Sequence, residues 1–229
     1  MACPTNTVDS MVTCLRAQSA YNITAAQWHH TDYWFDPPFA PVVDSNFLPD
    51  LPSNMLQRND VKDTEVILGV NKDEGIFWLL YYDKQLFPKS NAGELSREDF
   101  SKHVLPDLSL KANLPVQKGY LWEYVDSLTP ADRDSYRDVA DDISGDHLFK
   151  CPVVDFAQAY ARASSTHDVY LYSFEHRLSN NPWPAWTGVM HGYEIEAVFG
   201  LPLPYNYTQR ETNLAARITD YWTRFAQFG

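Results

Sequence analysis

The chain has 229 residues, 45% of them hydrophobic, and a formal net charge of −12. This length and composition are typical of one globular domain with a sizeable core. The acidic balance argues against a nucleic-acid partner, since phosphates are bound by clusters of Lys and Arg. No apolar run approaches the ~18 residues of a membrane-spanning helix. Residues 1–10 lack the charged and apolar regions of a signal peptide, so none is expected there.

The first half of the chain predicts a helix, an irregular segment, and a strand that leads into a second helix. Residues 8–18 have apolar side chains at helical spacing. Residues 35–52 contain five prolines, which forbid a helix. Residues 64–70, TEVILGV, form a short apolar run rich in branched side chains, which indicates a buried parallel strand. Residues 71–82, NKDEGIFWLLYY, are predicted to be a loop followed by a helix.

The second half of the chain predicts further helices and one more strand. The strand lies within residues 167–178, HDVYLYSFEHRL. Capping signals or an apolar face indicate helices over residues 96–105, 129–143, 151–163 and 208–228. Thr208 and Glu211 have the spacing of a capping box, and Thr129 precedes Pro130 as an N-cap precedes the first helical residue.

Strands separated by long helical segments predict an α/β fold with a parallel sheet flanked by helices. Only the two strands within 64–70 and 167–178 are convincing. A parallel sheet of two strands has two open edges and offers its helices too little surface to cover. We therefore expect the chain to be part of a larger domain.

Glu74 and His191 each follow one of these two strands, Glu74 directly and His191 after a loop. Catalytic groups collect at the carboxyl ends of strands in an open α/β sheet, so the two side chains are expected to meet there. The carboxylate would fix the imidazole tautomer and leave the other nitrogen as a general base. Gly188 and Gly192 would let this loop turn sharply.

The order nucleophile, acid, histidine is that of α/β-hydrolases, and Glu74 and His191 stand in its last two places. The nucleophile elbow G-x-S-x-G does not occur in the sequence. From spacing alone, the simpler interpretation is that Glu74 is a charge at a helix N-terminus. His191 would then be a hydrogen-bonded loop residue.

Four segments carry a resemblance to a known family. They are residues 68–82, residues 137–160, residues 170–203 (YLYSFEHRLSNNPWPAWTGVMHGYEIEAVFGLPL) and the final YWTRFAQFG. Together they closely resemble the cholinesterases within the type-B carboxylesterases. The resemblance implies that residues 1–229 are the C-terminal portion of an α/β-hydrolase catalytic domain, truncated at both ends.

The resemblance also implies roles for individual residues. Glu74 would be the acid and His191 the base of a Ser-Glu-His triad whose serine lies outside these residues, so that the fragment alone would be inactive. Glu194 would support the active-site network. Phe77 would contact the choline cation by cation–π attraction, Trp78 would lie in the acyl-pocket region and Trp28 at the rim. The aromatic side chains that the resemblance assigns to the substrate site are Phe77, Tyr81, Trp78, Tyr193, Trp183 and Trp28.

Three cysteines and two sequons bear on the compartment. The resemblance implies a disulfide between Cys3 and Cys14, and for Cys151 a partner beyond the end of this chain. The sequons Asn22-Ile-Thr and Asn206-Tyr-Thr are compatible with secretion. The parent protein is therefore expected to be secreted or at the cell surface, and a homo-oligomeric parent is compatible with the resemblance.

The expected activity is hydrolysis of a choline ester, with no metal or organic cofactor. Two alternatives stay open. The same fold family includes non-catalytic adhesion proteins, which tend to lose members of the triad. A general carboxylesterase would lack the preference for choline, which the aromatic lining favours.

Overall fold

The computed structural model describes residues 2–27, 38–90, 95–108, 114–126, 136–163, 166–201 and 207–229. The chain forms two units, Met1–Val42 and Val43–Gly229. The strands are β1 (Val66–Asn71) and β2 (Val169–Phe174). The α-helices are α1 (Val8–Arg16), α2 (Ala20–Ala26), α3 (Pro52–Gln57), α4 (Ile76–Tyr82), α5 (Arg97–Asp99), α6 (Leu105–Leu108), α7 (Leu114–Leu121), α8 (Tyr136–Gly145), α9 (Cys151–Ala163), α10 (Glu194–Val198) and α11 (Gln209–Phe228). Wider π-helical turns cover Phe100–Val104, Trp122–Asp126 and Asp146–Lys150, and a 3₁₀ turn covers Ala185–Thr187.

The N-terminal unit holds the two short helices α1 and α2. Thr7 caps α1, because its side chain accepts a hydrogen bond from the Ser10 N–H at 3.2 Å. A disulfide joins Cys3 to Cys14 across a separation of 11 residues, which confirms the pairing implied by the resemblance. Asn22 of the first sequon is exposed on α2, and Asn206 of the second lies outside the described residues.

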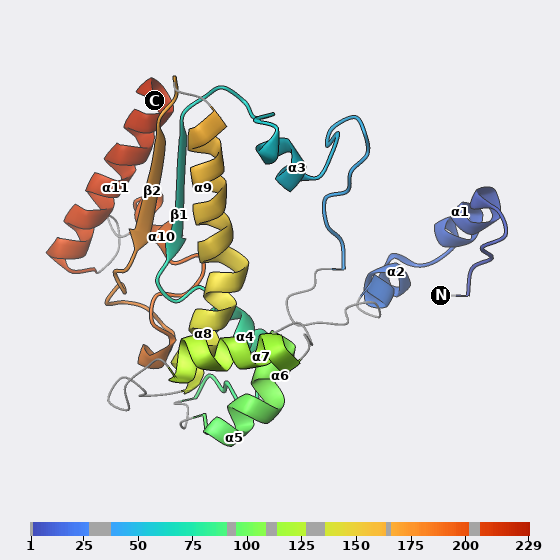
Figure 1. Cartoon of the computed structure of the whole chain (residues 1–229), viewed down its shortest axis with the longest axis horizontal. Coiled ribbons are helices and arrows are strands. Elements are labelled where there is room, and N and C mark those ends of the chain that lie inside the picture. The colour runs from blue at the N-terminus through green and yellow to red at the C-terminus, as the bar shows by residue number, and fades with distance from the viewer. Residues whose placement is uncertain are drawn as a thin grey trace. The chain divides into compact units, whose positions relative to one another are not determined.

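The sheet consists of β1 and β2, which pair in parallel from Val66 opposite Val169 to Asn71 opposite Phe174. Both predicted strands and their parallel pairing are confirmed. Parallel neighbours need a crossover connection, and the helices from α4 to α9 supply it. In Figure 1 the long helices α9 and α11 flank the two strands on opposite sides. The arrangement confirms a partial α/β fold.

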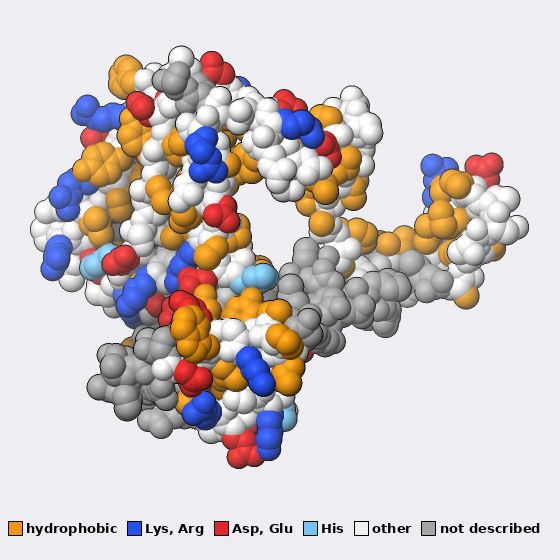
Figure 2. Space-filling model, in the orientation of Figure 1, with side chains coloured by type: hydrophobic (Ala, Val, Ile, Leu, Met, Phe, Trp, Pro, Cys, Tyr) orange, Lys and Arg blue, Asp and Glu red, His pale blue; other side chains and the backbone are white. Residues whose placement is uncertain are grey.

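The sheet is only partly buried. Strands of a parallel sheet are usually covered on both faces. Here Tyr170 is 46% and Leu171 50% exposed, and Tyr221 on α11 is 60% exposed. Figure 2 shows hydrophobic side chains at the surface over the region of the strands and α11. Within the described ranges neither β1 nor β2 has a second strand as neighbour, so each has one open edge.

The main core lies among the helices between the two strands. Its fully buried members come from α4 and the loop after it, the α5–α6 region, the π-helical turn before α8, and α8 itself: Ile76, Leu79, Phe87, Phe100, Val104, Val125 and Ile143. A smaller cluster of Phe174, Val189 and Ala197 lies beside the sheet. The helix that follows Glu74 is therefore anchored in the larger core.

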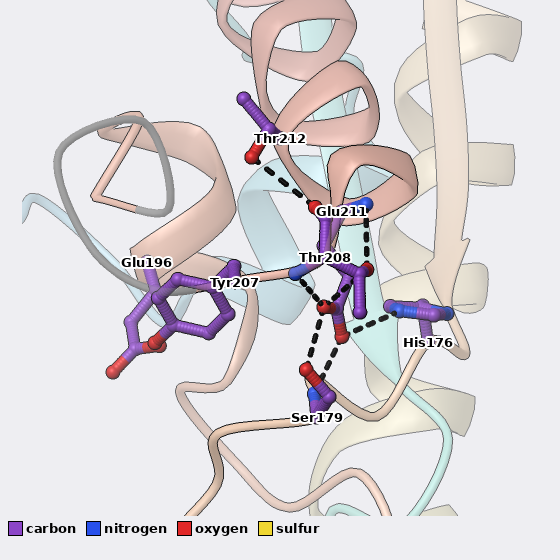
Figure 3. Close-up of polar contacts among 7 residues, drawn as sticks. All are labelled: His176, Ser179, Glu196, Tyr207, Thr208, Glu211 and Thr212. Atoms are coloured by element: carbon purple, nitrogen blue, oxygen red, sulfur yellow. Dashed lines mark hydrogen bonds and ion pairs between the residues drawn. The ribbon is translucent and has the colours of Figure 1, made fainter.

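The predicted capping box at the start of α11 is confirmed. Thr208 caps the helix, and the Glu211 carboxylate accepts a hydrogen bond from the Thr208 N–H at 2.9 Å. Figure 3 shows that the Glu211 carboxylate is also hydrogen-bonded to Ser179 and His176, which lie in the segment after β2. Burial alone would raise the pKa of Glu211, but the hydrogen bonds from Ser179 and Thr208 outweigh it and lower the pKa to about 2.

Two other predicted caps differ in outcome. Ser96 accepts a hydrogen bond from the Asp99 N–H at 3.0 Å, as a cap does. Thr129 and Pro130 lie outside the described residues. The described part of α8 begins at Tyr136. In the part of the chain that the structure describes, no helix combines the length and apolarity needed to cross a membrane.

Candidate active site

The first half of the site is the turn between β1 and α4, which carries Glu74. Asp141 on α8 accepts a hydrogen bond from the Ile76 N–H at 2.9 Å and so caps α4 from another helix. Asp141 is 4% exposed, and this burial, together with the nearby Asp73 charge, raises its pKa well above the usual range. Glu74 itself is 5% exposed. The turn is thus held on the helical core.

The second half is the loop between β2 and α10, which carries His191. Gly188 has φ of 55° and Gly192 has φ of 83°, values that residues with a side chain rarely adopt. The sharp turns expected at these two glycines are confirmed. They let the chain turn three residues before His191 and directly after it, and the His191 side chain reaches Glu74 at the end of β1.

Glu74 and His191 form a hydrogen bond 117 residues apart in sequence. The distance from His191 Nδ1 to Glu74 Oε2 is 2.7 Å. The other carboxylate oxygen accepts the N–H of Asn71 at 2.6 Å. The hydrogen bond that Glu74 accepts raises the pKa of His191 against the opposing effect of burial, and the charges of Glu74 and Glu194 add to this increase. Nε2 of His191 makes no hydrogen bond to any residue that the structure describes.

Three aromatic rings surround the imidazole of His191. The ring centroids of Phe77 and Trp78 lie 5.9 Å and 5.8 Å from it, and that of Phe149 lies at 4.8 Å. Phe77 also contacts Tyr81, one turn further along α4, at 4.8 Å. Phe77 and Trp78 therefore lie beside the expected base, whereas Tyr81, which is 60% exposed, contacts Phe77 rather than His191.

Glu194 is joined to the site through Asn71. The Asn71 side-chain amide donates to Glu194 Oε2 at 2.6 Å and to the main-chain carbonyl of Met190 at 2.9 Å. Asn71 is 1% exposed. Its Oδ1 is buried and finds no donor in the described ranges of the chain. Glu194 thus lies one side chain away from Glu74, through the residue whose N–H binds the Glu74 carboxylate.

Tyr193 and Trp183 lie together at a different point. The Tyr193 hydroxyl donates to Asn181 Oδ1 at 2.8 Å, and the main-chain N–H of Trp183 donates to the same oxygen at 2.9 Å. The Lys89 ammonium lies 4.1 Å from the centre of the Trp183 ring. Among the described residues, the rings that contact His191 do not include Tyr193 or Trp183. Trp28 lies outside the described residues.

Sequence reasoning missed Asn71, Phe149 and Asn181. Asn71 was part of the NKDEG loop and carried no signal beyond its place after a strand. Phe149 lies in the π-helical turn Asp146–Lys150, where no periodicity distinguished it. In the regions described, no group of three or more His, Cys, Asp and Glu side chains is arranged to hold a metal ion.

A family model described as the carboxylesterase family matches residues 1–229. Similar proteins include the acetylcholinesterase of Bungarus fasciatus, 42% identical over 233 residues, and that of Electrophorus electricus, 35% identical over 260 residues. The cholinesterase of Mus musculus is 38% identical over 226 residues.

These alignments cover 100%, 100% and 96% of this chain, but 38%, 41% and 36% of the respective relatives. The chain therefore spans about two-fifths of the length of the relatives it matches. The family model matches every residue, and the relatives agree with it over nearly the whole chain. The chain belongs to the carboxylesterase family.

Proposed function

We propose that this chain supplies the acid and the base of a serine esterase of the cholinesterase type. The observation that carries the proposal is the 2.7 Å hydrogen bond between His191 Nδ1 and Glu74, which leaves Nε2 without a hydrogen bond to any residue that the structure describes. In acyl transfer, a serine hydroxyl attacks the ester carbonyl while the base takes its proton. His191 Nε2 would take that proton and return it to the leaving alcohol.

Glu74 has two tasks in this proposal. It holds the tautomer in which Nδ1 carries the proton, and it stabilises the imidazolium that forms during attack. The raised pKa of His191 supports the second task. The nucleophilic serine would come from a segment outside these 229 residues, because the sequence contains no G-x-S-x-G.

A choline ester is the proposed substrate. Support comes from the rings of Phe77 and Trp78 beside His191 and from Tyr81 against Phe77, since ring faces attract a quaternary ammonium that cannot donate a hydrogen bond. The names of the relatives, acetylcholinesterase and cholinesterase, point the same way. The net charge of −12 would also draw a cationic ester toward the protein.

The proposed setting is a secreted or cell-surface protein of which these residues are the C-terminal part of the catalytic domain. The disulfide between Cys3 and Cys14 supports an oxidising compartment. Cys151 is exposed and unbridged, which leaves it available to a partner cysteine elsewhere in a longer protein.

The direct test is a chimera in which residues 1–229 replace the matching segment of the Bungarus fasciatus acetylcholinesterase, which supplies the serine. We expect thiocholine ester hydrolysis, and a loss of about 10⁴-fold in kcat for H191A and for E74A. H103A is the matched control, since His103 is exposed on the π-helical turn Phe100–Val104, which supplies none of the contacts to His191 described above. A folded chimera without activity, or one that tolerates H191A, would refute the proposal.

The chain alone is expected to hydrolyse no thiocholine ester above background. Turnover that a serine-directed organophosphate blocks would show that a nucleophile lies within these residues after all. Comparison of acetylthiocholine with an uncharged thioester of equal acyl length separates a choline esterase from a general carboxylesterase.

A further inference from the structure

His191 lies in a stretch, residues 188–193, that forms no helix or extended strand. Apart from one isolated parallel bridge between Asp73 and Met190, no ladder or helix of main-chain hydrogen bonds fixes the position of this loop. Its position depends on individual contacts from elsewhere in the chain. A shift of about 1 Å in a catalytic group is enough to lower a rate by about 10²-fold, so these contacts matter to any chemistry at His191.

Three side chains hold three consecutive residues immediately before His191. Arg177 donates to the Gly188 carbonyl at 3.2 Å, and Asn71 donates to the Met190 carbonyl at 2.9 Å. Between them Asp73 holds Val189, as described next. The loop is thus held at every residue from 188 to 190.

The contact of Asp73 with Val189 is double. The Asp73 N–H donates to the Val189 carbonyl at 3.0 Å, and the Asp73 carboxylate accepts the Val189 N–H at 2.6 Å. Asp73 therefore satisfies both main-chain groups of one residue. A bond to a charged acceptor is stronger than one between neutral groups, so the carboxylate contributes the larger share.

Gly188 shows how closely the two segments approach. A Cβ atom at this position would lie 2.0 Å from Asp73 Oδ2, a distance that no side chain tolerates. Its φ of 55° is also unfavourable for other residues. The sequence thus reserves the space at Gly188 for the Asp73 carboxylate.

We propose that Asp73 is a positioning residue that sets the geometry of the Glu74–His191 pair. Asp73 adjoins Glu74 in sequence, and Val189 lies two residues before His191. Glu74 and Asp73 therefore both lie in the turn after β1, so any movement of that turn shifts the two side chains together. The functional meaning of this role depends on the proposed esterase activity, whereas the positioning itself is measurable in the chain alone.

The test is NMR on the full 229-residue chain and its D73A and D73N variants. Two signals of His191 are followed: the pKa from its ring protons, and the downfield Nδ1–H resonance of the bond to Glu74. In D73A we expect the pKa to fall toward the ordinary value of about 6.5 and the downfield resonance to disappear. D73N keeps the shape with a weaker acceptor, so a smaller fall is expected.

The matched control is D142N, which removes a negative charge near Asp73 without touching the loop. Asp142 is exposed and forms an ion pair with Lys150. D142N should leave both His191 signals unchanged, which separates the positioning of the loop by Asp73 from a simple loss of negative charge. If D73A does not fold, D73N is read in its place.

Unchanged His191 signals in a folded D73A or D73N protein would overturn the proposal. Collapse of both variants would also overturn it, because Asp73 would then be needed for folding rather than for positioning. The esterase proposal is judged separately by the chimera. An inactive chimera with a normal D73A response would refute the esterase proposal and leave the positioning role in place.

Discussion

The ring of Phe149 lies 4.8 Å from the imidazole of His191, centroid to centroid, at an interplanar angle of 40°. The same ring stacks on Trp78 at 6.1 Å and 15°. Phe149 comes from the turn between α8 and α9, which is distant in sequence from both the β1–α4 turn and the loop after β2. A third segment of the chain therefore packs on the proposed base.

Removal of this ring should loosen His191. Because Phe149 is half-buried against two rings, F149A is expected to lower the free energy of unfolding in urea by about 1–2 kcal/mol. It should also expose the imidazole and speed its acylation by diethyl pyrocarbonate, followed by mass spectrometry of the His191 peptide. F156A removes a half-buried ring that stacks on Tyr160 instead. Equal acylation rates in the two variants would contradict the packing role.

Substitution of Glu74 should lower the pKa of His191. In E74Q the charged acceptor is gone and burial still disfavours the imidazolium, so we expect the pKa to fall to or below about 6.5. E65Q is the control, because Glu65 is exposed and near His167 rather than His191. NMR titration of the ring protons measures both variants.

The same substitution changes how stability depends on pH. The folded-state pKa of His191 is raised, so the pair stabilises the fold fully below about pH 6.5 and ceases to do so as pH rises through the folded-state value. The free energy of unfolding of E74Q should therefore differ from that of the parent chain more at about pH 5.5 than at about pH 8.5. The opposite order would be inconsistent with the pair.

Glu211 should be a strong contributor to stability above acidic pH. Its pKa is lowered from 4.5 to about 2, so its contribution is complete above pH 4.5 and lost as pH falls through about 2. At neutral pH, E211Q is expected to cost about 3 kcal/mol, measured by urea unfolding. E196Q is the control, since the Glu196 carboxylate accepts a bond from the Tyr207 hydroxyl but lies outside the Glu211 network. A similar loss in both variants would reject a special role for Glu211.

The open sheet should make the isolated chain associate with itself. Leu171 is half-exposed on β2, and exposed apolar edge strands promote pairing between molecules. We expect L171K to reduce the share of oligomers in analytical ultracentrifugation. Leu201 is 41% exposed but belongs to neither strand, so L201K should have little effect. If L201K disperses the oligomers equally well, general solubility rather than the strand explains the association.

Local patterns predicted most of the regular structure and half of the site. The apolar run at 64–70 and the capping box of Thr208 and Glu211 are short-range signals, and both correspond to elements of the fold. The approach of Glu74 to His191 followed from a rule about strand ends together with a family resemblance. The first two signals lie within a few residues of the sequence, whereas the resemblance is spread over four segments.

The supports of the pair could not be predicted in that way. Asp73 and Asn71 bind Val189 and Met190 across more than a hundred positions, and Phe149 comes from the π-helical turn Asp146–Lys150. A side chain that acts through one long-range contact leaves no periodic trace. The roles of Tyr193, Trp183 and Trp28 stay predictions, since the first two are joined through Asn181 rather than to His191.

Glu74 and His191 rest on parts of the fold that should open with unequal ease. The helix after Glu74 buries Leu79 completely in the main core, whereas the His191 loop packs through Val189 on a small cluster beside a half-covered sheet. Segments with fewer buried contacts open with smaller free energies. Amide hydrogen exchange should therefore be faster at Val189 than at Leu79. When the pair separates, the imidazole leaves and the carboxylate remains in place.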